Sequence, residues 1–284
     1  MERIRLWWSD TWFRPAGRIS FVAMRVIVAL QALWILASRP DLPSVAAWPV
    51  EFWKNLPATL FLRFGYFGRH PFMEWILYGV LFLLLIAVLV GFQIRVSALA
   101  AGLLVYHFAP LDSLLAIGDF ISMSGLTIPT LMLFIIWAVD ATASESPDYR
   151  WPVRLAQLLL AFGFFLSGVM KLRYVGWSWY TGANVRQLAL ATWSLSARPA
   201  AIWLATHSAA AWVVAIGSAL LDSLVIAAVF WRPLRWIVLV MAVVALPVRS
   251  IVFGYHGLAG PLLLVFVDWD LVRSRCVDRG FLRV

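Results

Sequence analysis

Charged side chains and cysteine are scarce in this 284-residue sequence. Asp, Glu, Lys and Arg together make up 13% of it, whereas 63% of the residues are hydrophobic. A soluble domain of this size could not keep so much apolar surface out of water, so a soluble globular protein is excluded. Cysteine occurs once, at Cys276, which excludes an intrachain disulfide and a metal site built from several thiolates.

The motifs of several common chemistries are also absent. The chain contains no Gly-x-Ser-x-Gly turn, no phosphate-binding loop and no dinucleotide fingerprint. Histidine, cysteine and acidic residues do not fall at metal-ligand spacing, so no metal site is predicted. The net charge of +9 does not indicate nucleic-acid binding, because the arginines lie between apolar runs, where topology and anionic lipid headgroups explain them.

Long apolar runs dominate what is present. Residues 75–92 include no charge and are long enough to cross a bilayer at about 1.5 Å rise per residue. The sequence therefore predicts an all-α, polytopic transmembrane helical bundle, formed by one domain of residues 1–284. About eight spans are expected, the last two short and broken around Pro247: 20–37, 71–92, 96–115, 122–139, 152–170, 208–230, 234–247 and 251–266.

Both ends of the chain are basic and are predicted to lie in the cytoplasm. Residues 1–19 combine arginine with tryptophan, which is typical of a segment lying at the membrane interface. Residues 271–284 form a basic tail. With eight spans, most arginines fall on the cytoplasmic side, as the positive-inside rule requires. The expected location is thus the membrane itself, with the lipid bilayer as the first partner.

Two oppositely charged residues lie deep within predicted spans. The rise per residue places Arg25 about 8 Å, and Asp222 about 12 Å, from the cytoplasmic ends of their spans. An isolated charge at such a depth costs a few kcal/mol, so the matched depths predict a structural ion pair. His107 lies in the middle of the third span and is expected to hydrogen-bond to a neighbouring helix.

A second group of polar residues gathers at the opposite, outer side. Lys171 ends the fifth span, and it is the candidate catalytic base together with Asp119 and His256. A lysine in an apolar pocket has its ammonium form disfavoured and can accept a proton. The remaining members are predicted to line a substrate or lipid pocket under an aromatic cover: Arg173, Trp177, Trp179, Tyr180, Gly182, Asp112 and Arg249.

Each candidate catalytic residue also has a structural interpretation. Lys171 can extend its ammonium to the headgroups, as boundary lysines do. Asp119 follows a glycine and can cap the fourth helix. His256 can be a packing residue with its hydrogen bonds satisfied.

The stretch from Ser167 to Arg173 carries a family resemblance. A Gly-x-x-Lys-Leu…Trp-x-x-Gly pattern is present as Gly168, Lys171, Leu172, Trp179 and Gly182. In this pattern the chain resembles the horizontally transferred transmembrane (HTTM) family, which includes the membrane domain of vitamin K-dependent γ-glutamyl carboxylase. Asp222, Asp119 and Asp140 match acidic positions of the family, and the likeness to its bacterial members implies a bacterial cytoplasmic membrane.

The resemblance implies a quinone-linked chemistry for Lys171. In the carboxylase, the matching lysine deprotonates reduced vitamin K, so the implied cofactor here is a quinone or a vitamin K-like hydroquinone. This sequence departs from the pattern in two ways. Asp119 stands where the carboxylase has a histidine, with His256 the one partial replacement for its other histidine, and the extracytoplasmic domain that captures the carboxylase's substrate is missing.

Three functions therefore stay open at this point. The first is a lysine-base, quinone-linked or carboxylase-like membrane enzyme. The second is a non-enzymatic factor for the maturation or export of a secreted peptide, with a peptide or protein partner on the extracytoplasmic side. Lipase maturation factors carry a similar Gly-x-x-Lys-Leu-Arg stretch. The third is a small-molecule transporter, for which no inverted repeat is visible.

Overall fold

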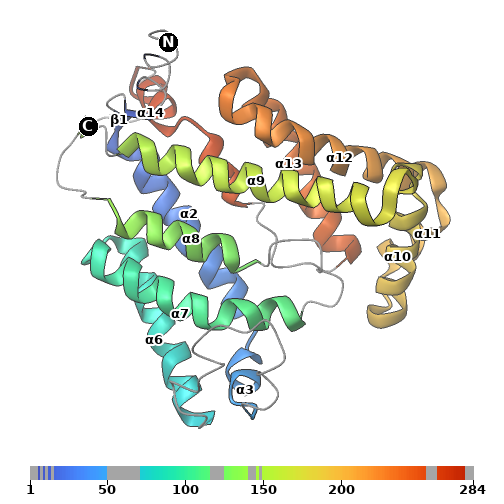
Figure 1. Ribbon diagram of the computed structural model, residues 1–284, viewed down its shortest axis with the longest axis horizontal. Coiled ribbons are helices and arrows are strands. Elements are labelled where there is room, and N and C mark those ends of the chain that lie inside the picture. Colours follow the sequence, from blue (N-terminus) through green and yellow to red (C-terminus); the bar gives the residue numbers. More distant parts are fainter. Residues whose placement is uncertain are drawn as a thin grey trace. The chain divides into compact units, whose positions relative to one another are not determined.

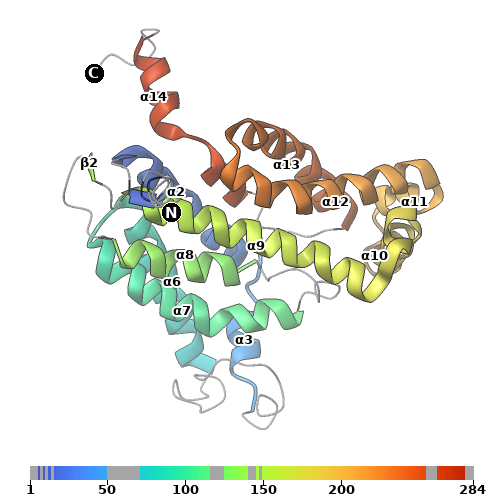
Figure 2. The same cartoon turned by 45° about the horizontal axis from the view of Figure 1, so that its top comes forward.

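The computed structural model describes residues 6, 9, 12–13, 16–49, 71–115, 125–139, 145–146, 149–253 and 261–278. Most of these residues are helical, as Figures 1 and 2 show. The chain divides into two compact units. Unit 1 comprises Met1–Ile117, Ser124–Gln157 and Val267–Val284, and unit 2 comprises Gly118–Met123 and Leu158–Phe266.

Unit 1 contains the N-terminal helices, a short strand pair and the last helix of the chain. Its elements are β1 (Ala16–Gly17), α2 (Arg18–Ala37), α3 (Leu42–Ala46), α6 (Pro71–Val90), α7 (Ile94–Leu115), α8 (Thr127–Trp137), β2 (Glu145–Ser146), the first residues of α9 (Arg150–Val175) and α14 (Trp269–Asp278).

A tight reversal after α6 makes α6 and α7 packed neighbours, as the sequence predicts. Gly91 ends α6 with φ at +87°, a left-handed conformation that glycine adopts without steric cost. A Cβ added there would lie 2.7 Å from Nη1 of Arg25. Glycine therefore lets the Arg25 guanidinium approach the carboxyl end of α6, where the helix dipole favours a cation.

A buried carboxylate–imidazole pair joins α6 to α7. Nε2 of His107 lies 2.9 Å from Oε2 of Glu74, and the two side chains are 1% and 3% exposed. This confirms the predicted hydrogen bond of His107 to a neighbouring helix. One turn along α6, the Tyr78 hydroxyl hydrogen-bonds to the carbonyl oxygens of Leu36 and Arg39. These polar contacts hold α6 against α7 and the end of α2.

Three contacts bring distant parts of the sequence to the start of α2. Strand β1 pairs with β2 in antiparallel register. The Ser20 hydroxyl donates a 2.6 Å hydrogen bond to Oδ2 of Asp270 on α14. The rings of Phe21 and Tyr149 lie 5.6 Å apart, and both are buried. The residues before α2, the residues before α9 and the helix α14 therefore meet at one end of unit 1.

Unit 2 contains the remainder of α9 and the helices that follow it. These are η2 (Gly176–Thr181, a 3₁₀ helix), α10 (Ala183–Ser196), α11 (Pro199–Thr206), α12 (Ser208–Phe230), α13 (Arg232–Phe253) and η3 (Pro261–Phe266, also 3₁₀).

The core of unit 2 is rich in alanine. Helices α10 and α11 lie side by side and pack against α12 and α13 (Figures 1 and 2). Small side chains allow helix backbones to approach closely, which is how helices associate in membranes. The buried cluster consists of Val185, Ala189, Ala201, Leu204, Ala205, Ala211, Ala215 and Val252.

Five helical segments are long and apolar enough to cross a membrane, so the chain is a predominantly α-helical integral membrane protein. They agree with the predicted spans 20–37, 71–92, 96–115, 152–170 and 208–230 to within a few residues, except that the segment predicted as 152–170 is longer. The segments are Arg18–Ala37, Pro71–Val90, Ile94–Leu111, Arg150–Thr181 and Ser208–Phe230.

The structure corrects the predicted break around Pro247. Helix α13 runs without interruption to Phe253, because neighbouring groups can satisfy the backbone carbonyl that a proline leaves free in a membrane helix. Within the predicted span 251–266, the segment η3 is a 3₁₀ helix. Helix α8 has 11 residues and is shorter than the predicted span 122–139, of which 122–124 lie outside the described residues. The count of eight spans stays a prediction.

Candidate functional site

The candidate site begins where α9 and α12 approach each other in unit 2. Gly168 faces α12, and a Cβ added to it would lie 3.2 Å from Cβ of Asp222. That distance is tighter than ordinary van der Waals contact between side chains. The absence of a side chain at Gly168 therefore sets how close Asp222 can come to α9.

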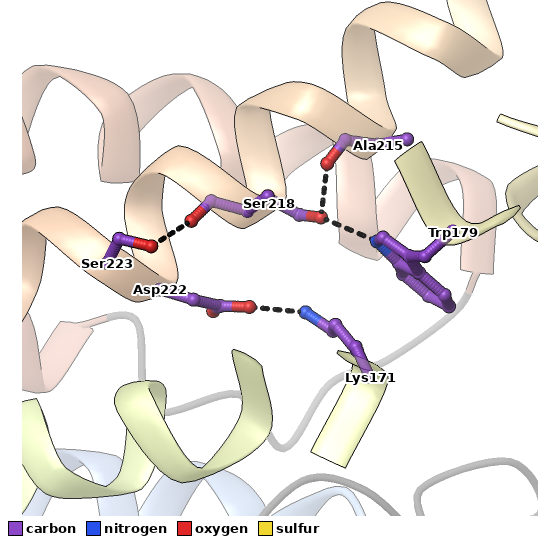
Figure 3. Close-up of polar contacts among 7 residues, drawn as sticks. Lys171, Trp179, Ala215, Ser218, Asp222 and Ser223 are labelled. Atoms are coloured by element: carbon purple, nitrogen blue, oxygen red, sulfur yellow. Dashed lines mark hydrogen bonds and ion pairs between the residues drawn. The ribbon is translucent and has the colours of Figure 1, made fainter. Parts of the chain in front are cut away.

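One turn further along α9, Lys171 forms an ion pair with Asp222 (Figure 3). Nζ of Lys171 donates a 2.6 Å hydrogen bond to Oδ2 of Asp222, and the side chains are 9% and 2% exposed. Charged groups at this burial occur in proteins only when they are paired, because desolvation otherwise costs several kcal/mol. Lys171 is thus a buried lysine with a carboxylate partner.

The sequence predicted Arg25 as the partner of Asp222, whereas within unit 2 the structure pairs Asp222 with Lys171. Membrane depths estimated from the rise per residue place the Cα of Lys171 at the membrane boundary and the Cα of Asp222 deeper, so Lys171 was not considered as its partner. Side chains on a helix, however, point toward its amino terminus. Along oppositely directed α9 and α12, the side chains of Lys171 and Asp222 therefore extend toward each other.

Arg25 occupies a different environment in unit 1. Its guanidinium lies against Gly91, and its Nε has no hydrogen-bond partner in the part of the chain that the structure describes. Arg25 is therefore assigned to the end of α6, and the structure gives Asp222 the lysine as its ion-pair partner.

Trp179 covers the lysine from η2. Nζ of Lys171 lies 5.2 Å from the centroid of the indole ring, within the range of a cation–π interaction. The indole Nε1 donates a 3.4 Å hydrogen bond to Oγ of Ser218, which in turn donates to the carbonyl of Ala215 (Figure 3). Ser218 and Asp222 are four residues apart on α12, so one face of this helix holds both Trp179 and Lys171.

Two glycines in left-handed conformations delimit η2. Gly176 has φ of +69° and Gly182 has φ of +78°. A Cβ at Gly182 would lie 2.7 Å from the backbone nitrogen of Trp212, whereas a Cβ at Gly176 would meet no atom within 4 Å. The carboxyl end of η2 is therefore packed tightly against the start of α12, and its amino end is open.

Two described residues that were predicted for the pocket, Arg173 and Trp177, have their printed ring contacts with other residues than Lys171. Arg173 is exposed, and its guanidinium lies 5.8 Å from the ring of Tyr174. Trp177 is 81% exposed and pairs with the ring of Tyr180. Among the predicted aromatic residues that are described, Trp179 is the one recorded in contact with the lysine.

Four predicted residues cannot be compared with the pair. Asp112 and Arg249 lie on α7 and α13, but their side chains are outside what the structure describes. Asp119 and His256 fall entirely outside the described residues. Their assignment to catalysis or to the pocket stays a prediction.

Sequence reasoning missed Ser218. A signal for it exists, because Ser218 lies four residues before Asp222 in an otherwise apolar run, and this spacing places both on one helix face. Sequence reasoning also missed Glu74, which lies in the first turn of α6 and was not considered as the partner of His107.

The site offers one cation, one carboxylate, one hydroxyl and one indole, which can bind and exchange a proton with a polar group of an otherwise apolar ligand. Among the described residues, no three His, Cys, Asp or Glu side chains come together in a way that could hold a metal ion. A scan of protein-family models, a search of curated proteins and a search of solved structures each found no match to this chain.

Proposed function

We propose that this membrane protein is of the HTTM type and that its Lys171–Asp222 pair binds and deprotonates a lipid-soluble hydroquinone. The observation that carries the proposal is the buried 2.6 Å pair beneath Trp179. Lys171 and the two residues that contact the pair, Gly168 and Trp179, all belong to the Gly-x-x-Lys-Leu…Trp-x-x-Gly pattern. A lysine that extends its ammonium to the headgroups has no need of a buried carboxylate partner. This contact therefore supports an enzymatic role for Lys171.

The pair supplies a base without an isolated buried charge. Transfer of one proton from Lys171 to Asp222 converts an ammonium–carboxylate pair into a neutral amine and a carboxylic acid. The amine lone pair can then accept a proton from a ligand hydroxyl. The ligand anion is left beside the new ammonium, and Asp222 keeps the first proton, so the net charge of the site does not change. Low-dielectric surroundings favour such a charge-neutral sequence.

The surroundings of the pair favour a flat, mostly apolar ligand that carries an acidic hydroxyl. The Trp179 indole offers a π-face for ring stacking, and the pair lies between two helices that are apolar enough to span a bilayer. A quinone or naphthoquinone in its reduced form has these properties. A small soluble acid would have to leave water to reach the pair, at a large desolvation cost.

A maturation or export factor for a secreted peptide is the second candidate. Exposed tryptophans on η2, α10 and α11 favour it, because large aromatic side chains are common where proteins bind one another or a membrane interface. They are Trp177, Trp193 and Trp203, at 81%, 43% and 54% exposure. Co-purification with a peptide, without turnover of any hydroquinone, would favour this function over the enzyme.

We also propose that the chain crosses the membrane about eight times and that both of its termini lie in the cytoplasm. The β1–β2 pairing supports an even number of crossings between residues 17 and 145, because paired strands outside the bilayer must share a membrane face. Helices α2, α6, α7 and α8 supply four, with α8 as the short one. The Ser20–Asp270 hydrogen bond supports an even number for the whole chain. Helices α9, α12 and α13 supply three more, and the eighth crossing is proposed for the part of the chain after α13, which includes η3.

Arginines at this shared face support its assignment to the cytoplasm. Arg18 begins α2, Arg150 and Arg154 begin α9, and Arg273 lies on α14. Their side chains are exposed or half-buried, and positive charge of this kind is retained on the cytoplasmic side.

The proton-abstraction step predicts a difference between two substitutions. A reduced naphthoquinone added without oxygen to the wild-type protein should show the absorption of its anion at a pH where the free compound stays protonated. We expect the anion to be absent in Lys171→Ala and also in Lys171→Arg, since arginine stays protonated and cannot accept a proton. Leu172→Ala, an exposed neighbour on α9, is the control. Full anion formation in Lys171→Arg would contradict a lysine base.

A further inference from the structure

The buried Lys171–Asp222 pair is not accessible to a ligand in this conformation. Lys171 is 9% exposed through its side chain and Asp222 is 2% exposed, so a ligand cannot reach the amine while the surrounding groups keep their positions. Something in unit 2 must move for the site to be used, if the proposed function holds. Outside these two helices, the described segment η2 contacts the lysine through Trp179.

Segment η2 has two features that favour local opening. It is a six-residue 3₁₀ helix, a geometry with poorer hydrogen bonds than the α-helix, and none of its residues is buried. Segments with few buried contacts open at a low free-energy cost. Its recorded side-chain hydrogen bond to α12 is the 3.4 Å contact between Trp179 and Ser218, at the long end of the usual range.

The two ends of η2 differ in how closely they are packed: the end at Gly182 is fixed, and the end at Gly176 is free. At Gly182 the backbone of α12 lies so close that even a Cβ would collide with it. At Gly176 a Cβ would meet nothing within 4 Å, and glycine there can change φ freely. Motion of η2 is therefore expected as a rotation at Gly176 while the contact at Gly182 stays in place.

We infer that η2 is a hinged cover of the Lys171–Asp222 site. In the closed state, Trp179 lies over the ammonium and donates to Ser218. In the open state, the chain rotates at Gly176, Trp179 leaves Ser218, and the Lys171 amine becomes accessible to an apolar, planar compound dissolved in the membrane. The ligand ring then occupies the space that the indole leaves beside the lysine.

The composition of the chain offers a direct test, because Lys171 and Lys54 are its two lysines. In a Lys54→Arg background, Lys171 is the one lysine amine. Its labelling rate by 1-fluoro-2,4-dinitrobenzene, a planar apolar reagent, can be followed by peptide mass spectrometry on protein in lipid nanodiscs. The measurement needs no quinone, so its outcome is separable from that of the proposed function.

Three changes should speed the labelling of Lys171. Removal of the tryptophan–serine hydrogen bond by Ser218→Ala should raise the rate about two- to tenfold, the range that one hydrogen bond allows. Trp179→Ala should raise it by more, because the cation–π contact is lost as well. Gly176→Ala should raise it about fivefold or more, since a left-handed alanine is strained in the closed state and relaxes on opening.

Two matched variants serve as controls. Gly176→Asn should label close to the parental rate, because asparagine tolerates the left-handed region. Trp177→Ala removes an equally large ring from the same segment, but one that is recorded against Tyr180 rather than the lysine, and it should have no effect. Parental labelling as fast as in Trp179→Ala, or an unchanged rate in both Ser218→Ala and Gly176→Ala, would overturn the hinged cover.

Discussion

Loss of either partner of the Lys171–Asp222 pair should destabilise the protein by about 3–5 kcal/mol, the cost of leaving one buried charge without its partner. Lys171→Met keeps the length of the side chain and removes its charge, and Asp222→Leu does the same for the acid. The double variant should recover most of the loss, because two apolar side chains can pack between α9 and α12 without any buried charge.

A double-mutant cycle measures this coupling. The free energy of unfolding of the four proteins in detergent, from a denaturation curve that is reversible, gives the interaction term between the two positions. Because the double variant should lose little, we expect a term larger than either single loss, about 5 kcal/mol or more, in favour of the pair. A double variant that loses as much as the sum of the two single variants would mean that Lys171 and Asp222 act independently, and it would remove the basis of the site.

Gly182→Ala is the second substitution with a large expected effect. It combines a left-handed alanine, which costs about 1–2 kcal/mol, with a Cβ placed 2.7 Å from the backbone nitrogen of Trp212. Backbone atoms cannot rotate away as a side chain can, so α12 must shift, which costs about 1–3 kcal/mol more. The expected total is about 2–5 kcal/mol of unfolding free energy.

Gly217→Ala is the matched control for that substitution. Gly217 lies inside α12, five residues after Trp212, and a Cβ there would meet no atom within 4 Å. Alanine is about 1 kcal/mol better than glycine in a helix interior, so this variant should be neutral or more stable. The difference is read from thermal unfolding in detergent. Equal stability of the two variants would refute the close packing of η2 on α12.

The membrane helices were predictable because apolar runs in this sequence end at clear polar boundaries. The span 208–230 agrees with α12 at both ends, since Ser208 and Arg232 delimit an apolar stretch in which Asp222 is the one charged residue. The hydrogen bond of His107 to a neighbouring helix was predictable from the cost of a buried imidazole. Its partner Glu74 was not, because a residue in the first turn of a helix looks accessible to water when only the sequence is read.

The pairing of Lys171 with Asp222 was not predictable from depth along the helix axes. Depth counting treats each side chain as lying level with its own Cα, whereas a lysine side chain reaches several ångströms back along its helix. The choice of Arg25 followed from that simplification. Helix α13 shows a similar limit, since proline signals a break in a soluble helix and is tolerated inside a membrane helix.

The central claim is that Lys171 and Asp222 form a ligand site for a reduced quinone, and the lipids that the purified protein retains test it most directly. Mass spectrometry of the extracted lipids should find a quinone or naphthoquinone with the wild type, and a large loss of it in both Lys171→Ala and Gly168→Ala. The second variant keeps the lysine but adds a Cβ that would lie 3.2 Å from Cβ of Asp222, which should disturb the pair. Equal amounts of quinone in all three proteins, or none in any of them, would contradict the account and direct attention to peptide partners.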